Sequence, residues 1–343
     1  MSIPQVQPTS FPQAVQEGVT TLKSSKQTCL HLSKKSDSSF RTSYDLVRDP
    51  DQEDRILILA KQRGVVKDPM GQKLDGSVKK FRNAKNVETG EEVAFLILQH
   101  EANTNVVRNE YNFLRQYKKC RGIAQVICMF EYDKTKINPL TNKPIHRIVL
   151  CVKKYKCLDL LSQLRNCALT NRKLSDECMK NMVLDLAHGL HTLHQNNVVH
   201  RDIKLENVLF DGEHFAIADF DAALTGEHDK RVKGSPNRHS PEKILASKSG
   251  KLTNDVERTS DIWGLALVWY EFHYFRGVPW ENMKDRKEQQ ETILSWEPVE
   301  PSDKESIHYL IWEMLNRDPL KRPTSLQILE RVKKIYTAPA EVV

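Results

Sequence analysis

Residues 200–210 of the chain read H-R-D-I-K-L-E-N-V-L-F. This run brings a carboxylate, an ammonium group and a carboxamide together over a short length of chain. Two short strands are predicted next to it, at 207–209 and at 215–218, from the apolar residues that they contain. We therefore expect the polar side chains of the run to lie on a loop that these two strands flank.

The run resembles the catalytic loop H-R-D-x-x-x-x-N of the protein kinases. The resemblance implies that Asp202 is the base that accepts the proton of the substrate hydroxyl. It also implies that Asn207 binds a magnesium ion, and that Lys204, placed as in serine/threonine kinases, neutralises the transferred phosphate. A lone His-Arg-Asp is compatible with a surface turn, but the match here is contiguous over the whole run.

A second acidic motif, Ala218-Asp219-Phe220-Asp221, resembles the magnesium-binding D-F-G motif of the same family. The resemblance implies that Asp219 binds the magnesium that bridges the phosphates, and that Phe220 packs beneath the helix that carries Glu110. Aspartate replaces the glycine of the motif. Because aspartate tolerates the left-handed backbone conformation better than most residues, we expect Asp221 to preserve the turn, with an altered switch between active and inactive orientations.

Residues 234–242, G-S-P-N-R-H-S-P-E, resemble the end of a kinase activation segment, G-T-P-x-Y-x-A-P-E. The resemblance implies that Ser235 contacts the catalytic loop. Arg238 replaces the usual aromatic residue, so we expect an unusual substrate-docking surface. Thr225 lies upstream in the same segment, and the resemblance implies that Arg201 binds its phosphate if it is phosphorylated. An unmodified loop threonine is the alternative.

Three further positions match structural residues of the family. The resemblance implies a buried ion pair between Glu242 and Arg322 in the C-terminal half of the chain. It also implies that Asp261, in the sequence Ser-Asp-Ile-Trp-Gly with Trp263, supports the catalytic loop from below. We expect these residues to contribute to stability rather than to the chemistry.

The N-terminal half departs from the family. Residues 93–96, V-A-F-L, occupy the strand that normally reads V-A-I-K, and Leu96 stands where the phosphate-binding lysine belongs. Counting back without gaps places the glycine-rich loop at 74–81, L-D-G-S-V-K-K-F, in which only Gly76 remains of the three glycines. Leucine cannot bind phosphate, so a replacement cation is required for ATP binding.

The loop is similar to that of the with-no-lysine kinases, which carry a lysine at the third glycine position. Here that position is Lys79, and the resemblance implies that Lys79 replaces the strand lysine, with Glu110 as its partner. A flexible ammonium group can reach phosphates from a neighbouring strand. The alternative is that Lys79 and Lys80 are solvated strand lysines. Lys153 falls at or next to the position that gates the nucleotide pocket, or else is a solvated edge-strand lysine.

The predicted fold class is α+β, a bilobal protein-kinase fold with a strand-rich N-lobe and a helical C-lobe. We place the kinase domain at 51–337, with the N-lobe at about 54–155 and the C-lobe at about 156–337. Residues 1–50, rich in Ser, Thr, Gln and Pro, are predicted to be mostly disordered. Residues 338–343 are a tail. Helical periodicity predicts helices at 105–118, 175–195, 259–274, 285–295, 304–315 and 324–336.

Composition excludes several classes of protein. Of the 343 residues, 39% are hydrophobic and 28% are charged, as in ordinary globular proteins, and the net charge of +7 shows no concentrated basic patch. We therefore predict no nucleic-acid partner. Seven cysteines without C-x-x-C spacing indicate a reducing compartment, and no apolar run is long enough to span a membrane. We expect a cytoplasmic location; secretion as an effector into a host cytosol is the alternative.

The leading hypothesis is a serine/threonine protein kinase that uses ATP and Mg²⁺ and acts on a protein substrate. The alternative is a pseudokinase that serves as a scaffold or allosteric module, which Leu96, the glycine-poor loop and Asp221 favour. Small-molecule phosphotransferases of related fold lack the Pro-Glu segment end and the Asp-x-Trp helix, both of which are present here. The predicted ATP- and metal-binding residues are Gly76, Lys79, Glu110, Asn207 and Asp219.

Overall fold

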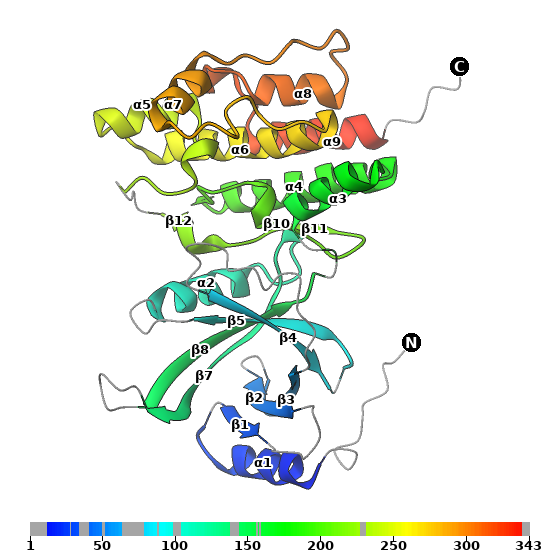
Figure 1. Cartoon of the computed structure of the whole chain (residues 1–343), viewed down its shortest axis with the longest axis vertical. Coiled ribbons are helices and arrows are strands. Elements are labelled where there is room, and N and C mark those ends of the chain that lie inside the picture. Colours follow the sequence, from blue (N-terminus) through cyan, green and yellow to red (C-terminus); the bar gives the residue numbers. More distant parts are fainter. Residues whose placement is uncertain are drawn as a thin grey trace. The chain divides into compact units, whose positions relative to one another are not determined.

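The computed structural model describes most of the chain, in two compact units. The first unit lies within Met1–Lys118 and Gln125–Lys154, and the second within Lys119–Ala124 and Tyr155–Val343. The first is rich in strands and the second in helices, as predicted for an α+β kinase fold (Figure 1). The described residues are 12–27, 29–33, 41–49, 52–63, 79–87, 89–98, 104–137, 144–155, 157, 159–226 and 231–337.

The strand-rich unit contains one antiparallel sheet, which has seven strands in the part of the chain that is described. Each strand pairs with its neighbours in the order β1-β2-β3-β4-β5-β8-β7. The strands are β1 (Cys29–Ser33), β2 (Arg41–Asp49), β3 (Gln52–Arg63), β4 (Lys79–Asn86), β5 (Glu92–Leu98), β7 (Val126–Ile137) and β8 (Pro144–Lys153).

Strand alternation divides the side chains of this sheet between two faces. Val93 and Phe95 of β5 point to one face, where they join an apolar core with Val149 and Phe130. The rings of Phe95 and Phe130 meet edge to face at 5.5 Å. Helix α2 (Thr104–Gln116) contacts β7 and β8 and is the helix predicted at 105–118. The face of β5 that carries Ala94 and Leu96 is thereby separated from this core.

The prediction of a mostly disordered N-terminus is wrong for the residues that form α1 (Gln13–Ser24), β1 and β2. Helix α1 lies along β1, β2 and β3 (Figure 1) and buries Val15 and Leu22 against Leu46, Ile56 and Ile58. These apolar residues are few and widely spaced in a mostly polar segment, so the composition of the segment predicted disorder instead of a helix. Their burial depends on partners in β2 and β3, which only the folded sheet provides.

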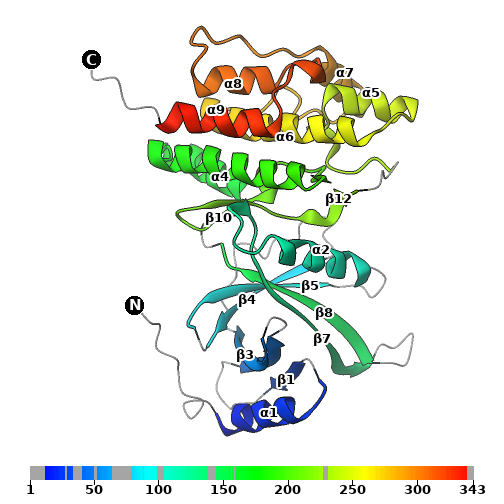
Figure 2. The ribbon, with the colours of Figure 1, turned by 180° about the vertical axis from the view of Figure 1, so that it is seen from behind.

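The helical unit contains seven α-helices among its described residues, stacked around α6. Figure 2 shows α4, α6 and α9 lying side by side, and α8 also contacts α6 and α9. The helices predicted beyond residue 170 are all present. The predicted ones are α4 (Asp176–Gln195), α6 (Asn254–Tyr274), α7 (Arg286–Ser295), α8 (Ile307–Met314) and α9 (Ser325–Thr337), and the structure adds α3 (Leu160–Thr170) and α5 (Pro241–Ser249), which were not predicted.

Side-chain caps define where these helices begin. The hydroxyl of Ser175 accepts from the Cys178 amide at the start of α4, and Thr253 does the same for Val256 at the start of α6. Helix α6 is apolar and buried around most of its circumference, as expected for a helix at the centre of a domain. Three charged residues of α6, Glu257, Asp261 and Glu271, are therefore held in a dry environment, whereas Asp255 in the first turn is exposed.

Short strands complete the helical unit. Strands β10 (Val208–Phe210) and β11 (Phe215–Ile217), the two predicted strands, pair as an antiparallel hairpin, and β6 (Gly122–Ile123) adds to β11 in parallel. Strand β9 (Val198–Val199), which was not predicted, pairs with β12 (Leu224–Thr225). Residues 200–207 lie between β9 and β10, whereas both predicted strands follow the loop in the chain.

Other sequence predictions meet the described residues only in part. Gly76 and the tail at 338–343 lie outside them. All seven cysteines lie inside them, and none of the seven forms a disulfide. Of the helices described, none combines the length and the apolarity that crossing a membrane requires.

Candidate active site

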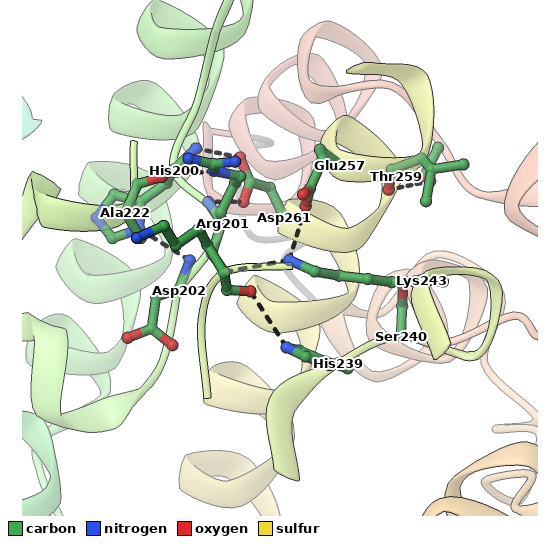
Figure 3. Close-up of polar contacts among 12 residues, drawn as sticks. His200, Arg201, Asp202, Ala222, His239, Ser240, Lys243, Glu257, Thr259 and Asp261 are labelled. Atoms are coloured by element: carbon green, nitrogen blue, oxygen red, sulfur yellow. Dashed lines mark hydrogen bonds and ion pairs between the residues drawn. The ribbon is translucent and has the colours of Figure 1, made fainter. Parts of the chain in front are cut away.

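Asp261 of α6 holds the loop formed by residues 200–207, the 200–207 loop, by its backbone. One carboxylate oxygen accepts from the amide of His200 and the other from the amide of Arg201, each at 2.7 Å (Figure 3). The ring of His194 also contacts this carboxylate, at 3.1 Å. Burial alone would raise the pKa of Asp261, but these contacts lower it, so the carboxylate is ionised. The predicted support of the loop by Asp261 is confirmed.

The carboxylate of Asp202 is fixed by three neighbours. The amide of Ser235 donates to Oδ1 at 2.7 Å, and the Lys204 ammonium group lies 2.9 Å from Oδ2. Lys204 also donates to the Ser235 hydroxyl at 2.7 Å, and the Asn207 amide donates to Oδ2 at 3.2 Å. Burial works against ionisation of Asp202, yet the Lys204 charge and these hydrogen bonds hold its pKa below the ordinary value. The predicted contact between Ser235 and the loop is confirmed.

The β10–β11 hairpin brings Asn207 next to the Asp219 motif. The amide of Ala218 donates a hydrogen bond to the Asn207 carbonyl at 2.8 Å. Asp219 is the next residue after Ala218, so this hydrogen bond brings it close to Asn207. The side-chain nitrogen of Asn207 donates to the Asp202 carbonyl at 2.9 Å, which leaves its oxygen as the end that can bind a cation. Magnesium prefers such hard oxygen ligands, so an amide oxygen and the Asp219 carboxylate fit the ion that the family uses.

The turn after Asp219 differs from the prediction. Asp219, not Asp221, takes the left-handed conformation, with φ 63° and ψ 74°. Asp221 lies within the single 3₁₀ turn Phe220–Ala222, so its position does not require a glycine. The guanidinium of Arg201 donates to the Ala222 carbonyl at 2.5 Å, and the buried Phe220 ring meets His200 edge to face. The backbone strain is therefore stored at the proposed metal ligand, where strain often accompanies function.

Arg238, which replaces the usual aromatic residue of the segment, turns its side chain inward. Its guanidinium is buried and lies 2.7 Å from Glu271 of α6 and 3.1 Å from Glu281. Desolvation opposes its charge, but the two carboxylates raise the pKa of Arg238 above the ordinary value. The indole of Trp280 donates to the neighbouring Asn237 carbonyl at 2.8 Å. The segment after Ser235 is thus anchored to α6 and to the loop that follows it.

The ion pair predicted between Glu242 and Arg322 is present and bidentate. The two nitrogen–oxygen distances are 2.7 and 2.9 Å, and Thr259 donates to the same carboxylate at 2.9 Å. The Arg322 guanidinium also lies over the Trp263 ring, 5.0 Å from its centre. Such a planar, stacked arrangement suits arginine and would not suit lysine.

Sequence reasoning missed a second buried pair, Lys243 with Glu257. The ammonium of Lys243 lies 2.7 Å from a carboxylate oxygen of Glu257, and both side chains are buried. Both residues lie outside the helices predicted from periodicity, so the sequence pattern did not indicate that they are buried. No motif pointed to it.

The strand-rich unit contains Lys79 and Glu110 of the residues predicted to bind ATP, and Leu96 at the position of the missing lysine. Leu96 is on β5, with Ala94 on the same face. Register pairs Lys79 with Leu98 and Phe81 with Leu96 on the adjacent β4, so position 79 belongs to the sheet face of Leu96. The side chain of Lys79 lies outside what the structure describes. Glu110 is buried on α2.

Lys153 pairs in register with Val93, on the face opposite to Leu96. Its amide donates to the Gln125 carbonyl at 2.9 Å, and its side chain is half-buried. Val152, the neighbour of Lys153 on β8, pairs with Ala94 and so lies on the sheet face of Leu96. The β8 residue next to Lys153 on that face is therefore apolar.

Comparison with known proteins identifies the same architecture. A family model described as protein kinase domain matches residues 66–332. The chain is 32% identical over 157 residues to a probable serine/threonine-protein kinase PLK of Dictyostelium discoideum, covering 44% of this chain and 15% of that protein. It is 33% identical over 167 residues to a probable serine/threonine-protein kinase CCRP1 of Zea mays, covering 46% and 25%.

A longer match extends over more of the chain. Serine/threonine-protein kinase 40 of Gallus gallus is 25% identical over 282 residues, which cover 75% of this chain and 60% of that protein. In each of these three relatives the matched part is less than two thirds of the whole protein.

Proposed function

The chain belongs to the protein kinase domain family, and on that premise we propose that it is an active serine/threonine kinase that transfers the γ-phosphate of ATP to protein hydroxyl groups. The observation that carries the proposal is the environment of Asp202. Its carboxylate has a lowered pKa and is fixed by Ser235 and Lys204, so it is ionised and oriented before a substrate arrives. A carboxylate that accepts the proton of a substrate hydroxyl must be both ionised and correctly oriented.

Three polar residues of the 200–207 loop, together with Asp219, then have distinct roles. Asp202 orients the substrate hydroxyl and accepts its proton. The Lys204 ammonium, shared between Asp202 and the Ser235 hydroxyl, offsets negative charge on the transferred group. Asn207 and Asp219 contribute oxygen ligands. Magnesium-bound ATP, when present, supplies the phosphoryl group and the charge neutralisation that this transfer needs.

On the ATP side, the register of β4 supports Lys79 as the replacement for the missing strand lysine. Position 79 belongs to the sheet face of Leu96, one strand away. Residues diagonally opposite on neighbouring strands are about 7–8 Å apart, which a lysine side chain can span. The buried carboxylate of Glu110 on α2 is the proposed partner of that ammonium.

The decisive experiment measures phosphate transfer. The purified chain is incubated with γ-labelled ATP, Mg²⁺ and a generic protein substrate, in parallel with Asp202→Ala. We expect the wild type to exceed the variant by roughly 10²- to 10⁴-fold, the usual contribution of a positioned base. Equal labelling by the two proteins, with both folded, would refute the proposal.

The pseudokinase alternative rests on a specific observation, the apolar Leu96 at the phosphate-binding position of β5. A thermal-shift titration with ATP and Mg²⁺ separates the two functions. Binding raises the melting temperature, because a ligand that binds only the folded state stabilises it. Stabilisation without transfer identifies a nucleotide-binding scaffold, and the absence of both identifies a scaffold that does not use ATP.

A further inference from the structure

Lys243 and Glu257 form an ion pair that is almost completely withdrawn from water. Their side chains are 1% and 0% exposed, and their charged atoms are 2.7 Å apart. Lys243 lies in the first turn of α5 and Glu257 in the first turn of α6. Burying an ion pair costs several kcal/mol of desolvation, which its own attraction often does not recover. Its position within the fold therefore calls for an explanation.

The Lys243 ammonium has a second neighbour, the backbone carbonyl of Arg201, to which it donates at 3.5 Å. Figure 3 shows the lysine extending from α5 toward the 200–207 loop, with Glu257 on its other side. The Arg201 carbonyl belongs to the peptide group that joins Arg201 to Asp202. A restraint on this carbonyl is thus a restraint on the backbone of the proposed base.

The backbone at Arg201 needs such a restraint. Its φ of 69° is left-handed, a conformation that costs a residue with a side chain energy unless its surroundings fix it. Asp261 holds its amide. Gly234 packs against its carbonyl so closely that a Cβ at position 234 would lie 2.1 Å from the oxygen. Lys243 supplies a polar contact to the same carbonyl.

We propose that Lys243 is a positioning residue, which holds the Arg201 carbonyl and thereby orients the Asp202 carboxylate. The role rests on the proposed kinase function of Asp202. Lys243 does not touch the substrate. Glu257 holds the ammonium in place, and the two together tie α5 and α6 to the 200–207 loop.

The competing explanation is that Lys243 serves only to neutralise Glu257. The double variant Lys243→Met/Glu257→Met separates the two, because replacing both members of a buried pair by apolar residues of similar volume is often neutral for stability. Under our proposal it melts close to the wild type but loses kcat by roughly ten- to a hundredfold, as for a small misplacement of a catalytic group, while KM for ATP changes little. Wild-type kcat in the double variant would overturn the proposal.

A second variant, Glu257→Gln, keeps Lys243 and an oxygen that can accept from its ammonium; it leaves a buried charge without its counter-ion, which lowers stability, but it does not remove the contact to the carbonyl. We expect it to retain most of the wild-type kcat. If it loses as much as the double variant is expected to lose, the ion pair and not the carbonyl contact is responsible, and the proposal fails. This comparison remains decisive even if the double variant does not fold. Lys248→Met, an exposed lysine in the last turn of α5, is the matched control.

Hydrogen exchange tests the same contact without any catalysis. In Glu257→Gln, and in the double variant where it folds, we compare exchange of the His200 and Arg201 amides with that of α9. The proposal expects at least about tenfold faster exchange at 200–201 in the double variant with unchanged exchange in α9, and, in Glu257→Gln, no acceleration at 200–201 beyond the acceleration seen in α9. A greater loss of protection at 200–201 than in α9 in Glu257→Gln contradicts it. If the wild type labels no better than Asp202→Ala, the kinase function fails, and exchange still decides the role of Lys243.

Discussion

The helical unit and the strand-rich unit differ in how they hold the residues that the family motifs identify. In the helical unit the motif charges are buried and paired: Asp261 accepts two backbone amides, and Glu242 makes a bidentate pair with Arg322. The same unit contains two further buried ion pairs, Arg238 with Glu271 and Lys243 with Glu257. Chemistry and stability are therefore coupled in this unit.

The strand-rich unit is held mainly by apolar packing. Its cores are formed by residues such as Val93, Phe95 and Phe130, and the ion pair of Arg108 with Glu131 is partly solvated, with side chains 42% and 28% exposed. Leu96 adds an apolar residue at the position where the family places a lysine. If Lys79 replaces the strand lysine as proposed, a charge used only for ligand binding can change its strand in such a sheet, whereas a charge built into the core cannot.

The largest effect is expected from Arg322→Met, which leaves Glu242 without its buried partner. Breaking a buried pair in this way costs about 3–5 kcal/mol in the free energy of unfolding. Chemical denaturation measures it. Arg317→Met is the matched control, because the pair of Arg317 with Glu297 is exposed at 47% and 70% and is worth about 0–1 kcal/mol. Equal losses in the two variants would contradict the coupling described for the helical unit.

A second stability effect tests the apolar packing of the strand-rich unit. Leu22 of α1 is completely buried, so Leu22→Ala should lower the free energy of unfolding by about 3 kcal/mol, or the melting temperature of this unit if it unfolds separately. Lys23→Ala, one position along on the exposed side of the helix, should change it by less than about 0.5 kcal/mol. If Leu22→Ala behaves like Lys23→Ala, α1 does not belong to the folded unit.

Lys79→Met should reduce activity without reducing stability. We expect kcat/KM to fall by roughly a hundredfold, or about 2.7 kcal/mol, because one preorganised positive contact to the phosphates is lost. ATP titration and labelled-phosphate transfer measure it, and the melting temperature should stay constant. Lys80→Met, at the next position on β4 and so on the other sheet face, is the control. Unchanged ATP affinity and activity in Lys79→Met would contradict the proposal that Lys79 replaces the strand lysine.

The smallest effect is a pH dependence of stability in the helical unit. Burial and the nearby Lys243 lower the pKa of His239 from 6.5 to about 4. The unfolded chain therefore takes up a proton at a higher pH than the folded one, so stability is complete above about pH 6.5 and falls as the pH drops toward 4. We expect this histidine to account for about 1–3 kcal/mol of that loss.

The variant His239→Gln should flatten this part of the curve, because glutamine has no proton to gain. His273, whose burial also lowers its pKa to about 4, remains in both proteins and cancels in the comparison. A wild-type slope in His239→Gln would remove the role of His239.

Much of the helical unit follows from the sequence. The 200–207 loop, the pairing of Glu242 with Arg322 and the support from Asp261 were all predicted, because the motifs that contain these residues resemble those of the protein kinases. The N-terminal helix α1 was not, because only two of its side chains, Val15 and Leu22, are apolar and buried in a segment of otherwise polar composition. The residues that precede the predicted glycine-rich loop at 74–81 carry no family motif.

The sequence by itself determined which chemical groups this protein carries and their order: the Asp202, Lys204 and Asn207 groups of the loop, the Asp219 carboxylate, and leucine in place of lysine at position 96. These are covalent facts, and the motifs that contain them are local. Only the tertiary structure decided that Arg238 turns inward, that Asp219 rather than Asp221 is left-handed, and that Lys243 meets both Glu257 and the Arg201 carbonyl. Each of these depends on partners distant in sequence, because a buried charge or a strained backbone is stable only where the surrounding fold compensates it.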